Sequence, residues 1–407
     1  MKTPHFLTGV LVLMVAACEP LFFNYTPGDI RETHVSKTVR EPRLPGQDPA
    51  SGTGKDYCFT AVSFPEGYDW RRDSSYGAVA ASVRLYRNGI CALEVPAGEL
   101  SCADADMHHF IGGHLYTQSR SSGHTVLARD GVEILRMAGE EILEGLIPGG
   151  DKDYTLWQNK SGRGIILRLG ADTVLFRSRG TIVGSLREHS YLGGGALLDL
   201  YGKPAFYYRQ DGECYIAGEG IQSLISFPQG ILLDIRLVNG ESCIFFQDEY
   251  GQSAKMRFEG YLRDYTRSGY RYAKSGRIYV TGKTAVCIGA VKPVSGGQES
   301  TCVNFGPSEW EVIPAAGAIP LSLSNPRQYM GYTQEGSIYL YSRQSGMQYI
   351  QGKYYSFALS DGIVCGGSAI LALNPMENGR KPALWIDGEI TEVDINGFIS
   401  GVYSVSQ

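Results

Sequence analysis

The stretch Leu384-Trp385-Ile386-Asp387-Gly388-Glu389 decides the fold of this chain. An apolar run ends at an Asp-Gly pair, and a second run begins directly after it. Asp-Gly and Asn-Gly pairs between such runs are the strongest short signal for a β-hairpin, because both central residues adopt positive φ. The same signal follows three other strand-like runs, at Asn88-Gly89, Asp130-Gly131 and Gln210-Asp211-Gly212. We therefore expect a chain built from antiparallel strands.

Glycine turns recur along the chain at a regular spacing. They are found at Gly89, Gly131, Gly170, Gly212, Gly251, Gly306, Gly346 and Gly388. The spacings are 39 to 42 residues, except for one of 55 that contains Gly- and Pro-rich insertions at 293–298 and 314–317. A four-stranded propeller blade takes roughly 40 to 45 residues. The spacing predicts an all-β β-propeller of four-stranded antiparallel blades, with eight blades as the first choice and seven as the alternative.

Two units show the four-strand pattern of a blade most clearly. Around Gly212 the expected strands are 196–201, 204–209, 213–217 and 221–227, and around Gly388 they are 363–373, 381–386, 390–393 and 398–405. Helical periodicity is almost absent, and the one stretch that suggests it, 136–146, is weakened by Gly139 and Gly145. We expect a single propeller domain over residues 55–407.

Composition excludes several classes of protein. Of the 407 residues 19% are charged and 52 are glycine, with a formal net charge of -5. Soluble domains contain roughly 25% charged residues and 7% glycine, so a mainly disordered chain and an extended charged tail are both excluded. The acidic balance also argues against nucleic acid as a partner.

The first residues have the features of a lipoprotein signal. An apolar run from Phe6 to Ala17, too short to span a bilayer, ends in Val15-Ala16-Ala17-Cys18. Small residues before a cysteine resemble the bacterial lipobox, in which the signal (1–17) is removed and Cys18 is acylated. The alternative is an ordinary secretory signal with a chance cysteine. Residues 18–54 are rich in Pro and Gly without periodicity, which predicts a tether.

The hairpin turns, repeated at this spacing behind a lipobox, resemble those of uncharacterised β-propeller lipoproteins of the Bacteroidota cell envelope. The turns that carry the resemblance are Leu384-Trp385-Ile386-Asp387-Gly388-Glu389 and Tyr86-Arg87-Asn88-Gly89. The resemblance covers nearly the whole chain. It implies a lipid-anchored protein of the cell envelope, on the outer membrane, and it implies no catalytic residues.

Eight cysteines remain beyond Cys18. Most of them lie in apolar strand-like runs, where small buried hydrophobic residues are the default expectation. Cys91 and Cys102 flank a turn and could face each other across a hairpin. No close Cys-x-x-Cys spacing suggests a zinc or redox site.

Catalytic and metal motifs are weak. Gly276 to Thr284 ends like a phosphate loop, but the glycine spacing is wrong and no helix follows, so a strand turn is expected. Histidines and carboxylates gather at 104–109, with Asp106, His108 and His109, yet no alternation brings three ligands to one point. We therefore predict no metal and no cofactor.

The geometry of a blade suggests where a ligand would bind. If the four strands of a blade are called a to d in order, the b-to-c turn and the connection to the next blade emerge on one face. We expect the Asn-Gly and Asp-Gly turns on this face too. The loops between blades are rich in Arg, Tyr and His, which suit oxygen-rich ligands. The predicted ligand-binding residues are Asp106, His108, His109, Arg187, His189, Tyr191, Tyr265, Arg267, Tyr270, Arg327 and Tyr329.

The expected function is binding of a glycan, a peptide or an envelope protein at this rim, without catalysis. One alternative is a propeller glycan hydrolase or lyase that uses rim residues such as Asp106, His108, Glu188 and His189 as acid and base. Another is a structural subunit of an envelope complex. Propeller architecture favours none of these, because function depends on the residues of the site.

Overall fold

The computed structural model places a continuous series of strands after residue 55. The residues that it describes are 56–70, 81–96, 108–121, 123–139, 141–159, 164–184, 196–200, 202–225, 230–238, 241–258, 261–281, 284–306, 309–314, 319–320, 330–334, 337–342, 346–350, 357–365, 367–377 and 379–405. Within these ranges the regular elements are β-strands, and no helix there is long and apolar enough to cross a membrane.

The described strands form eight sheets, which we call blades A to H, the first of the two expected blade numbers. Blade A holds β1 (Tyr57–Ser63), β2 (Ser82–Arg87), β3 (Ile90–Pro96) and β33 (Gly397–Ser404). Blade B holds β4 (His108–Ile111), β5 (His114–Ser121), β6 (His124–Arg129) and β7 (Val132–Ala138). Blade C holds β8 (Glu141–Ile147), β9 (Tyr154–Asn159), β10 (Ile165–Leu169) and β11 (Asp172–Arg177). Blade D holds β12 (Thr181–Ile182), β13 (Leu197–Leu200), β14 (Lys203–Gln210), β15 (Glu213–Gly218) and β16 (Ile221–Ile225).

The second half of the chain repeats the pattern. Blade E holds β17 (Ile231–Val238), β18 (Glu241–Gln247), β19 (Ala254–Phe258) and β20 (Tyr261–Asp264). Blade F holds β21 (Tyr270–Thr281), β22 (Thr284–Pro293), β23 (Ser300–Gly306) and β24 (Glu309–Ile313). Blade G holds β25 (Ile319–Pro320), β26 (Met330–Gln334), β27 (Ser337–Ser342) and β28 (Gly346–Tyr349). Blade H holds β29 (Phe357–Cys365), β30 (Ser368–Pro375), β31 (Ala383–Ile386) and β32 (Glu389–Glu392).

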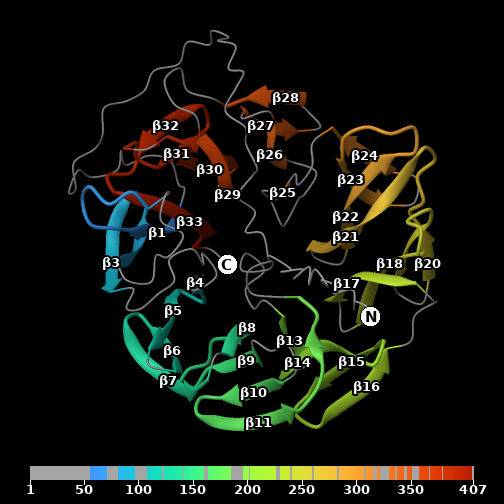
Figure 1. Cartoon of the computed structure of the whole chain (residues 1–407), viewed down its shortest axis with the longest axis horizontal. Coiled ribbons are helices and arrows are strands. Elements are labelled where there is room, and N and C mark those ends of the chain that lie inside the picture. Colours follow the sequence, from blue (N-terminus) through green and yellow to red (C-terminus); the bar gives the residue numbers. More distant parts are fainter. Residues whose placement is uncertain are drawn as a thin grey trace, which may run out of the picture. The chain divides into compact units, whose positions relative to one another are not determined.

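Every blade is antiparallel, and its strands follow one another from the centre of the domain outward (Figure 1). Blade A closes the series. Its innermost strand is β33, from the end of the chain, and it pairs with β1, from the beginning, between Tyr57↔Ser404 and Ser63↔Gly397. The two ends of the domain are therefore joined within one sheet.

The predicted hairpin turns are confirmed by their backbone conformation. Among the described residues, the non-glycine residues with positive φ are the four predicted Asn and Asp residues, each followed by a glycine that also has positive φ. Their φ angles are 50° at Asn88, 51° at Asp130, 53° at Asp211 and 49° at Asp387. Both central residues of a type I′ turn need this conformation, which Asn, Asp and Gly tolerate best.

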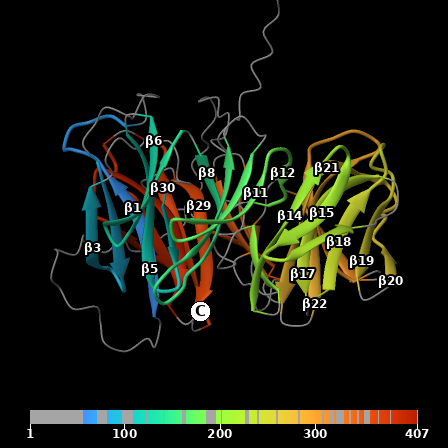
Figure 2. The same ribbon diagram turned by 90° about the horizontal axis from the view of Figure 1, so that it is seen from below.

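The strands run between two opposite faces (Figure 2). The interblade face carries the b-to-c turns and the connections between blades, and the hairpin face carries the a-to-b and c-to-d turns. The turns at Asn88, Asp130 and Asp387 join the third and fourth strands, so they lie on the hairpin face, and only the turn at Asp211 lies on the interblade face. Our expectation that these turns share a face with the interblade loops was therefore wrong for three of the four.

Polar side chains join one blade to the next. On the second strand of its blade, Gln158 accepts a hydrogen bond from Ile182 N (2.9 Å) and donates to Gly180 O (3.3 Å) at the first strand of blade D. Gln118 does the same for blades B and C, and Asn374 for blades H and A. These side-chain amides form hydrogen bonds with backbone N–H and C=O groups of the next blade and so satisfy them.

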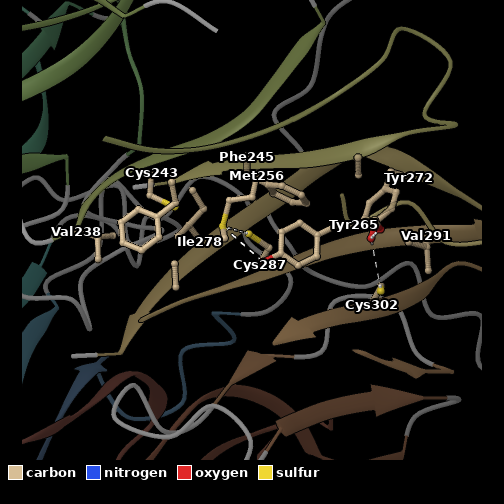
Figure 3. Close-up of a cluster of buried hydrophobic side chains, with 13 residues drawn as sticks. Val238, Cys243, Phe245, Met256, Tyr265, Tyr272, Ile278, Cys287, Val291 and Cys302 are labelled. Carbon is tan, nitrogen blue, oxygen red and sulfur yellow. Dashed lines mark hydrogen bonds between the residues drawn. The ribbon is translucent and has the colours of Figure 1, made fainter. Parts of the chain in front are cut away.

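The core lies between neighbouring blades rather than within one of them. Between blades E and F it includes Phe245, Met256, Tyr265, Cys287 and Cys302 (Figure 3). Six of the seven described free cysteines are buried, as expected, and Cys91 is exposed. Cys102 lies outside the described residues, so the suggested pair with Cys91 stays a prediction.

Three further expectations can be compared with the strands. Where a helix was considered, residues 136–138 belong to β7 and residues 141–146 belong to β8. The phosphate-loop-like segment 276–284 lies in the hairpin of β21 and β22, where Thr281 pairs with Thr284, as expected. Residues 187, 189 and 191 were expected between two blades; they fall instead between β12 and β13, which pair with the same side of β14 and interrupt the first strand of blade D.

Candidate functional site

Five of the predicted ligand-binding residues lie in the described part of the chain, on two separate groups of blades. His108 and His109 belong to blade B, and Tyr265, Arg267 and Tyr270 lie at the start of blade F. The remaining predicted residues lie outside the described residues: Cys18, which was predicted to be acylated, Asp106, Arg187, His189, Tyr191, Arg327 and Tyr329.

His108 and His109 lie on the inner strand β4, not in the loop before it. Both side chains are buried, with 2% and 4% of their surface exposed. His108 Nε2 forms a hydrogen bond with Ser400 Oγ on β33, and Ser400 Oγ lies 2.9 Å from Thr60 Oγ1 on β1. Ser400 is the extra residue of a β-bulge, which turns its side chain away from the regular pleat.

The arrangement of Ser400 and His108 superficially resembles a nucleophile and its base, but its electrostatics oppose that chemistry. Burial, followed by the neighbouring His109, lowers the pKa of His108 to about 3. A general base works best when its pKa is near the working pH, and an imidazolium in this position would be desolvated beside a second histidine. The pair therefore supports the junction of blades A and B rather than catalysis.

Asp361 is a second ionisable group beside β33, and it is half-buried. Its Oδ1 accepts a hydrogen bond from Gly362 N and its Oδ2 accepts one from Val402 N, both at 2.8 Å. Burial raises the pKa of this carboxyl to about 6, and the two hydrogen bonds oppose the rise. Both oxygens are used by the backbone, so Asp361 acts as a connection between blades H and A.

Tyr265 and Arg267 lie in the predicted connection between β20 and β21, but their side chains point into the protein. Tyr265 is 0% exposed and Arg267 is 6% exposed. Arg267 Nη2 donates to Asn304 Oδ1 at 2.7 Å, and its Nη1 donates to Thr266 O at 3.2 Å. The guanidinium that we expected to contact a ligand at the rim is therefore held inside the boundary between blades E and F.

A buried hydrogen-bond network fixes the same boundary. The hydroxyl of Tyr272 donates to Tyr265 O at 2.9 Å, and Asn304 Nδ2 lies 3.2 Å from that hydroxyl. Figure 3 shows the hydroxyl of Tyr272, on β21 of blade F, pointing toward Cys302 on β23 of the same blade. Burial raises the pKa of Tyr272, so the phenol stays protonated and can donate. The network therefore holds the connection between β20 and β21 in a fixed position.

Tyr250 is the most exposed large hydrophobic residue of the described chain, at 74%. It lies in the b-to-c loop of blade E, which Asp248 closes: Oδ1 accepts from Tyr250 N (3.0 Å) and Gln252 N (2.9 Å), and Oδ2 accepts from Ser253 N (2.9 Å). These bonds lower the pKa of Asp248 against an opposing effect of burial. The loop thus presents an aromatic side chain on a fixed backbone.

One backbone hydrogen bond connects this loop to the start of blade F, and a second joins the b-to-c loop of blade F to the connection between the two blades. Tyr272 N donates to Gly251 O (2.9 Å), and Val294 N donates to Gly269 O (2.8 Å). Val294 is 57% exposed, and between the two loops lie the half-buried Tyr270 and the exposed Arg271. We call Tyr250, Tyr270, Arg271 and Val294 the E–F surface; it lies on the interblade face.

The sequence analysis placed Tyr270 at this surface but missed Tyr250 and Val294. Both lie in b-to-c loops, whereas the prediction considered only the connections between blades. The signal that could have found Tyr250 is the run Asp248-Glu249-Tyr250-Gly251 directly after a buried strand, because an Asp that begins a turn often bonds the backbone that follows. Within the described ranges, no group of three or more His, Cys, Asp or Glu side chains could hold a metal ion.

Comparison with known proteins supports the architecture. No family model matches the chain, and no curated protein is similar to it. Among solved structures it is similar to dihydro-haem d1 dehydrogenase NirN in complex with DHE, with a TM-score of 0.51 and 13% identity over 90% of this chain and 78% of that one.

Two further solved structures are more distant. The β-propeller domain of Cps50 (Swd1) from Myceliophteria thermophila gives a TM-score of 0.35 and 12% identity, over 69% of this chain and 96% of that one. A protein of unknown function from Bacteroides caccae gives 0.30 and 10%, over 87% and 100%. At 13% identity the similarity to NirN concerns the fold alone, and the function has to be argued from the residues of the site.

Proposed function

We propose that this chain is a binding propeller of the cell envelope, anchored through an acylated Cys18, that holds a partner protein at the E–F surface. The observation that carries the proposal is Tyr250, which is 74% exposed on a loop whose backbone Asp248 fixes. An exposed aromatic residue on a rigid backbone loses little conformational entropy on binding.

The composition of the E–F surface supports a protein as the partner. Tyrosine and arginine are enriched among the residues that dominate protein interfaces, and Val294 adds an exposed aliphatic contact beside them. The two backbone hydrogen bonds between the loops hold these side chains in a fixed relative position. The surface therefore needs little rearrangement before it binds.

The position of the first described residues supports an orientation in which the E–F surface faces away from the anchor. Asp56 O accepts a hydrogen bond from Val405 N (3.1 Å), and Tyr57 O accepts one from Asn88 N (3.0 Å) in a c-to-d turn. The described domain thus begins on the hairpin face, opposite the E–F surface. A domain tethered from that side can present the E–F surface away from its anchor.

Site-specific photo-crosslinking in cells that make the protein naturally would test the proposal. A benzophenone amino acid at position 250, 270 or 294 should give one and the same crosslinked protein band. The matched control is position 176, because Phe176 is 61% exposed on the outer strand of blade C. The absence of a band from all three positions, or the same band from position 176, would overturn the proposal.

A further inference from the structure

Trp310 differs from the other tryptophans of this chain. Trp70, Trp157 and Trp385 are between 0% and 6% exposed, whereas Trp310 is 45% exposed. It lies on β24, the outermost strand of blade F (Figure 1). A large aromatic surface that is left in solvent usually marks a place of contact.

Strand pairing shows which way the indole faces. Trp310 pairs with Asn304 on β23, so the two side chains lie on the same face of blade F. Asn304 Oδ1 accepts the hydrogen bond from Arg267, which belongs to the connection that leaves blade E. Trp310 therefore faces blade E.

Tyr261 faces the same boundary from the other side. It pairs with Phe258 on β19, and Phe258 packs in the core that blades E and F share. Side chains of directly opposed residues lie on one face of a sheet, so Tyr261 faces blade F. It is 70% exposed on β20, the outermost strand of blade E.

Guanidinium groups lie behind these two aromatic residues. Arg267 Cζ is 4.9 Å from the centre of the Trp310 ring, and its hydrogen bonds to Asn304 and Thr266 fix it there. Arg263 pairs with Met256, so it lies on the Tyr261 face of β20, and it is half-buried. A guanidinium has five N–H donors, so Arg263 can contact Tyr265 and still donate to a ligand.

These four side chains have the chemistry that an acidic sugar needs. A pyranose ring has flat C–H faces that pack on an aromatic ring and a rim of hydroxyl groups that stay in water, and a guanidinium pairs with a carboxylate through two parallel hydrogen bonds. On β24 the residues beside Trp310 are Glu309 and Glu311, and Glu311 accepts a hydrogen bond from Tyr341 on the side of blade G. A stable protein interface should bury more than about 1,000 Å². Charged residues on both sides of Trp310 leave only a small apolar surface, which suits a single sugar ring better than a broad protein interface.

We propose that Tyr261, Arg263 and Trp310, with Arg267 as a positioning residue behind the indole, bind a uronic acid unit of an acidic polysaccharide. This site lies on the outer strands and does not depend on the E–F surface. No covalent step is involved.

Fluorescence titration gives a direct test, because Trp310 is the exposed one of the four tryptophans. The probes are tetrasaccharides of galacturonic, mannuronic and glucuronic acid, with neutral maltotetraose for comparison. At least one acidic tetrasaccharide should shift the tryptophan emission and bind at least ten-fold more tightly than maltotetraose. If none of the acidic probes binds, or if the neutral one binds equally well, the proposal fails.

Variants of the full chain separate the roles of the residues, with binding followed by calorimetry. Trp310→Ala and Tyr261→Ala should each weaken binding at least ten-fold, Trp310→Phe should weaken it less, and Arg263→Gln should remove the preference for acidic sugars. Arg267→Lys should shift the emission of Trp310 even without sugar. Unchanged binding in both Trp310→Ala and Tyr261→Ala would overturn the site.

Two controls complete the experiment. Phe176→Ala changes an exposed aromatic residue on another blade, and Tyr250→Ala changes the E–F surface; both should leave sugar binding unchanged. Crosslinking of a protein, but no sugar binding, at positions 261 and 310 would identify a protein interface and refute the sugar site. That outcome would leave the proposal for the E–F surface intact.

Discussion

The backbone N–H of Val402 on β33 donates a hydrogen bond to Oδ2 of Asp361 on β29 over 2.8 Å. Ile278 N on β21 donates in the same way to Asp234 Oδ2 on β17, also at 2.8 Å. The partners are 41 residues apart in the first case and 44 in the second, which is one blade. In both, the other oxygen accepts the N–H of the residue that follows the aspartate. The propeller thus repeats a carboxylate connection between inner strands.

Asp361 should make the protein more stable in mild acid. Its pKa is raised to about 6 from 3.8, so folding favours the protonated carboxyl. The contribution of this group to the free energy of unfolding therefore rises as pH falls from about 6 to 3.8, by up to about 1.4 kcal/mol per pH unit. Urea unfolding at pH 7 and pH 5 should show this rise relative to Asp361→Asn. The assignment is wrong if the two proteins respond equally to pH.

His108 should have the opposite effect. Its pKa is lowered from 6.5 to about 3, so the unfolded chain takes up a proton that the folded chain refuses. The contribution of His108 is complete above pH 6.5 and is lost as pH falls toward 3, again by about 1.4 kcal/mol per pH unit. In His108→Gln this loss should disappear from the same unfolding series. An NMR titration in which His108 protonates near pH 6.5 would contradict the prediction.

Two glutamines on the second strands of their blades should respond in opposite ways to substitution. Gln158 bonds both a carbonyl and an N–H at the next blade, so Gln158→Met should lower the free energy of unfolding by about 1–3 kcal/mol. Gln247 is 1% exposed, and neither of its amide atoms has a hydrogen-bond partner among the described residues. Gln247→Met should therefore be neutral or stabilising. Equal losses in both variants would show that Gln247 is satisfied.

The turn at Asp211 should prefer glycine to a branched residue. Its φ of 53° is left-handed, a conformation that costs roughly 1–2 kcal/mol for an ordinary L-residue. Asp211→Val should lower the free energy of unfolding by about this amount, whereas Asp211→Gly should change it little. The midpoints of thermal unfolding of the two variants test this prediction, and similar midpoints would refute it.

Substitution of Cys18 tests the predicted lipid anchor. If Cys18 is acylated, the wild-type protein should incorporate radiolabelled palmitate and partition into detergent, because stable anchoring takes more than one acyl chain. Cys18→Ser should lose the label and appear in the aqueous phase. A wild-type protein that stays in the aqueous phase without label would favour the ordinary secretory signal.

The architecture could be predicted from the sequence because it depends on local chemistry that repeats. The Asn and Asp residues before glycine at positions 88, 130, 211 and 387 needed positive φ, and each has it. The assignment of those turns to a face failed because a sequence gives the spacing of turns but not their position within a blade. Six glycine turns join third and fourth strands, whereas Gly212 and Gly251 join second and third strands.

The candidate site was harder to predict because polarity alone does not tell where a side chain points. Arg267 and His108 look like ligand contacts in a loop, but one is held by Asn304 and the other by Ser400. Tyr250 and Trp310 are exposed because of strand pairing and loop closure, which depend on partners that are distant in the sequence. Such relationships need the fold before they can be recognised.

The pairing of β33 with β1 has a consequence for how the protein is made. A ribosome releases β1, β2 and β3 first, and they must wait through the synthesis of seven further blades with the inner edge of β1 uncovered. Folding of blade A is therefore delayed until β33 has been synthesised. A nascent chain stalled before Gly397 would present an open strand edge, which other polypeptides can bind, so truncated products of this chain should be the ones that aggregate.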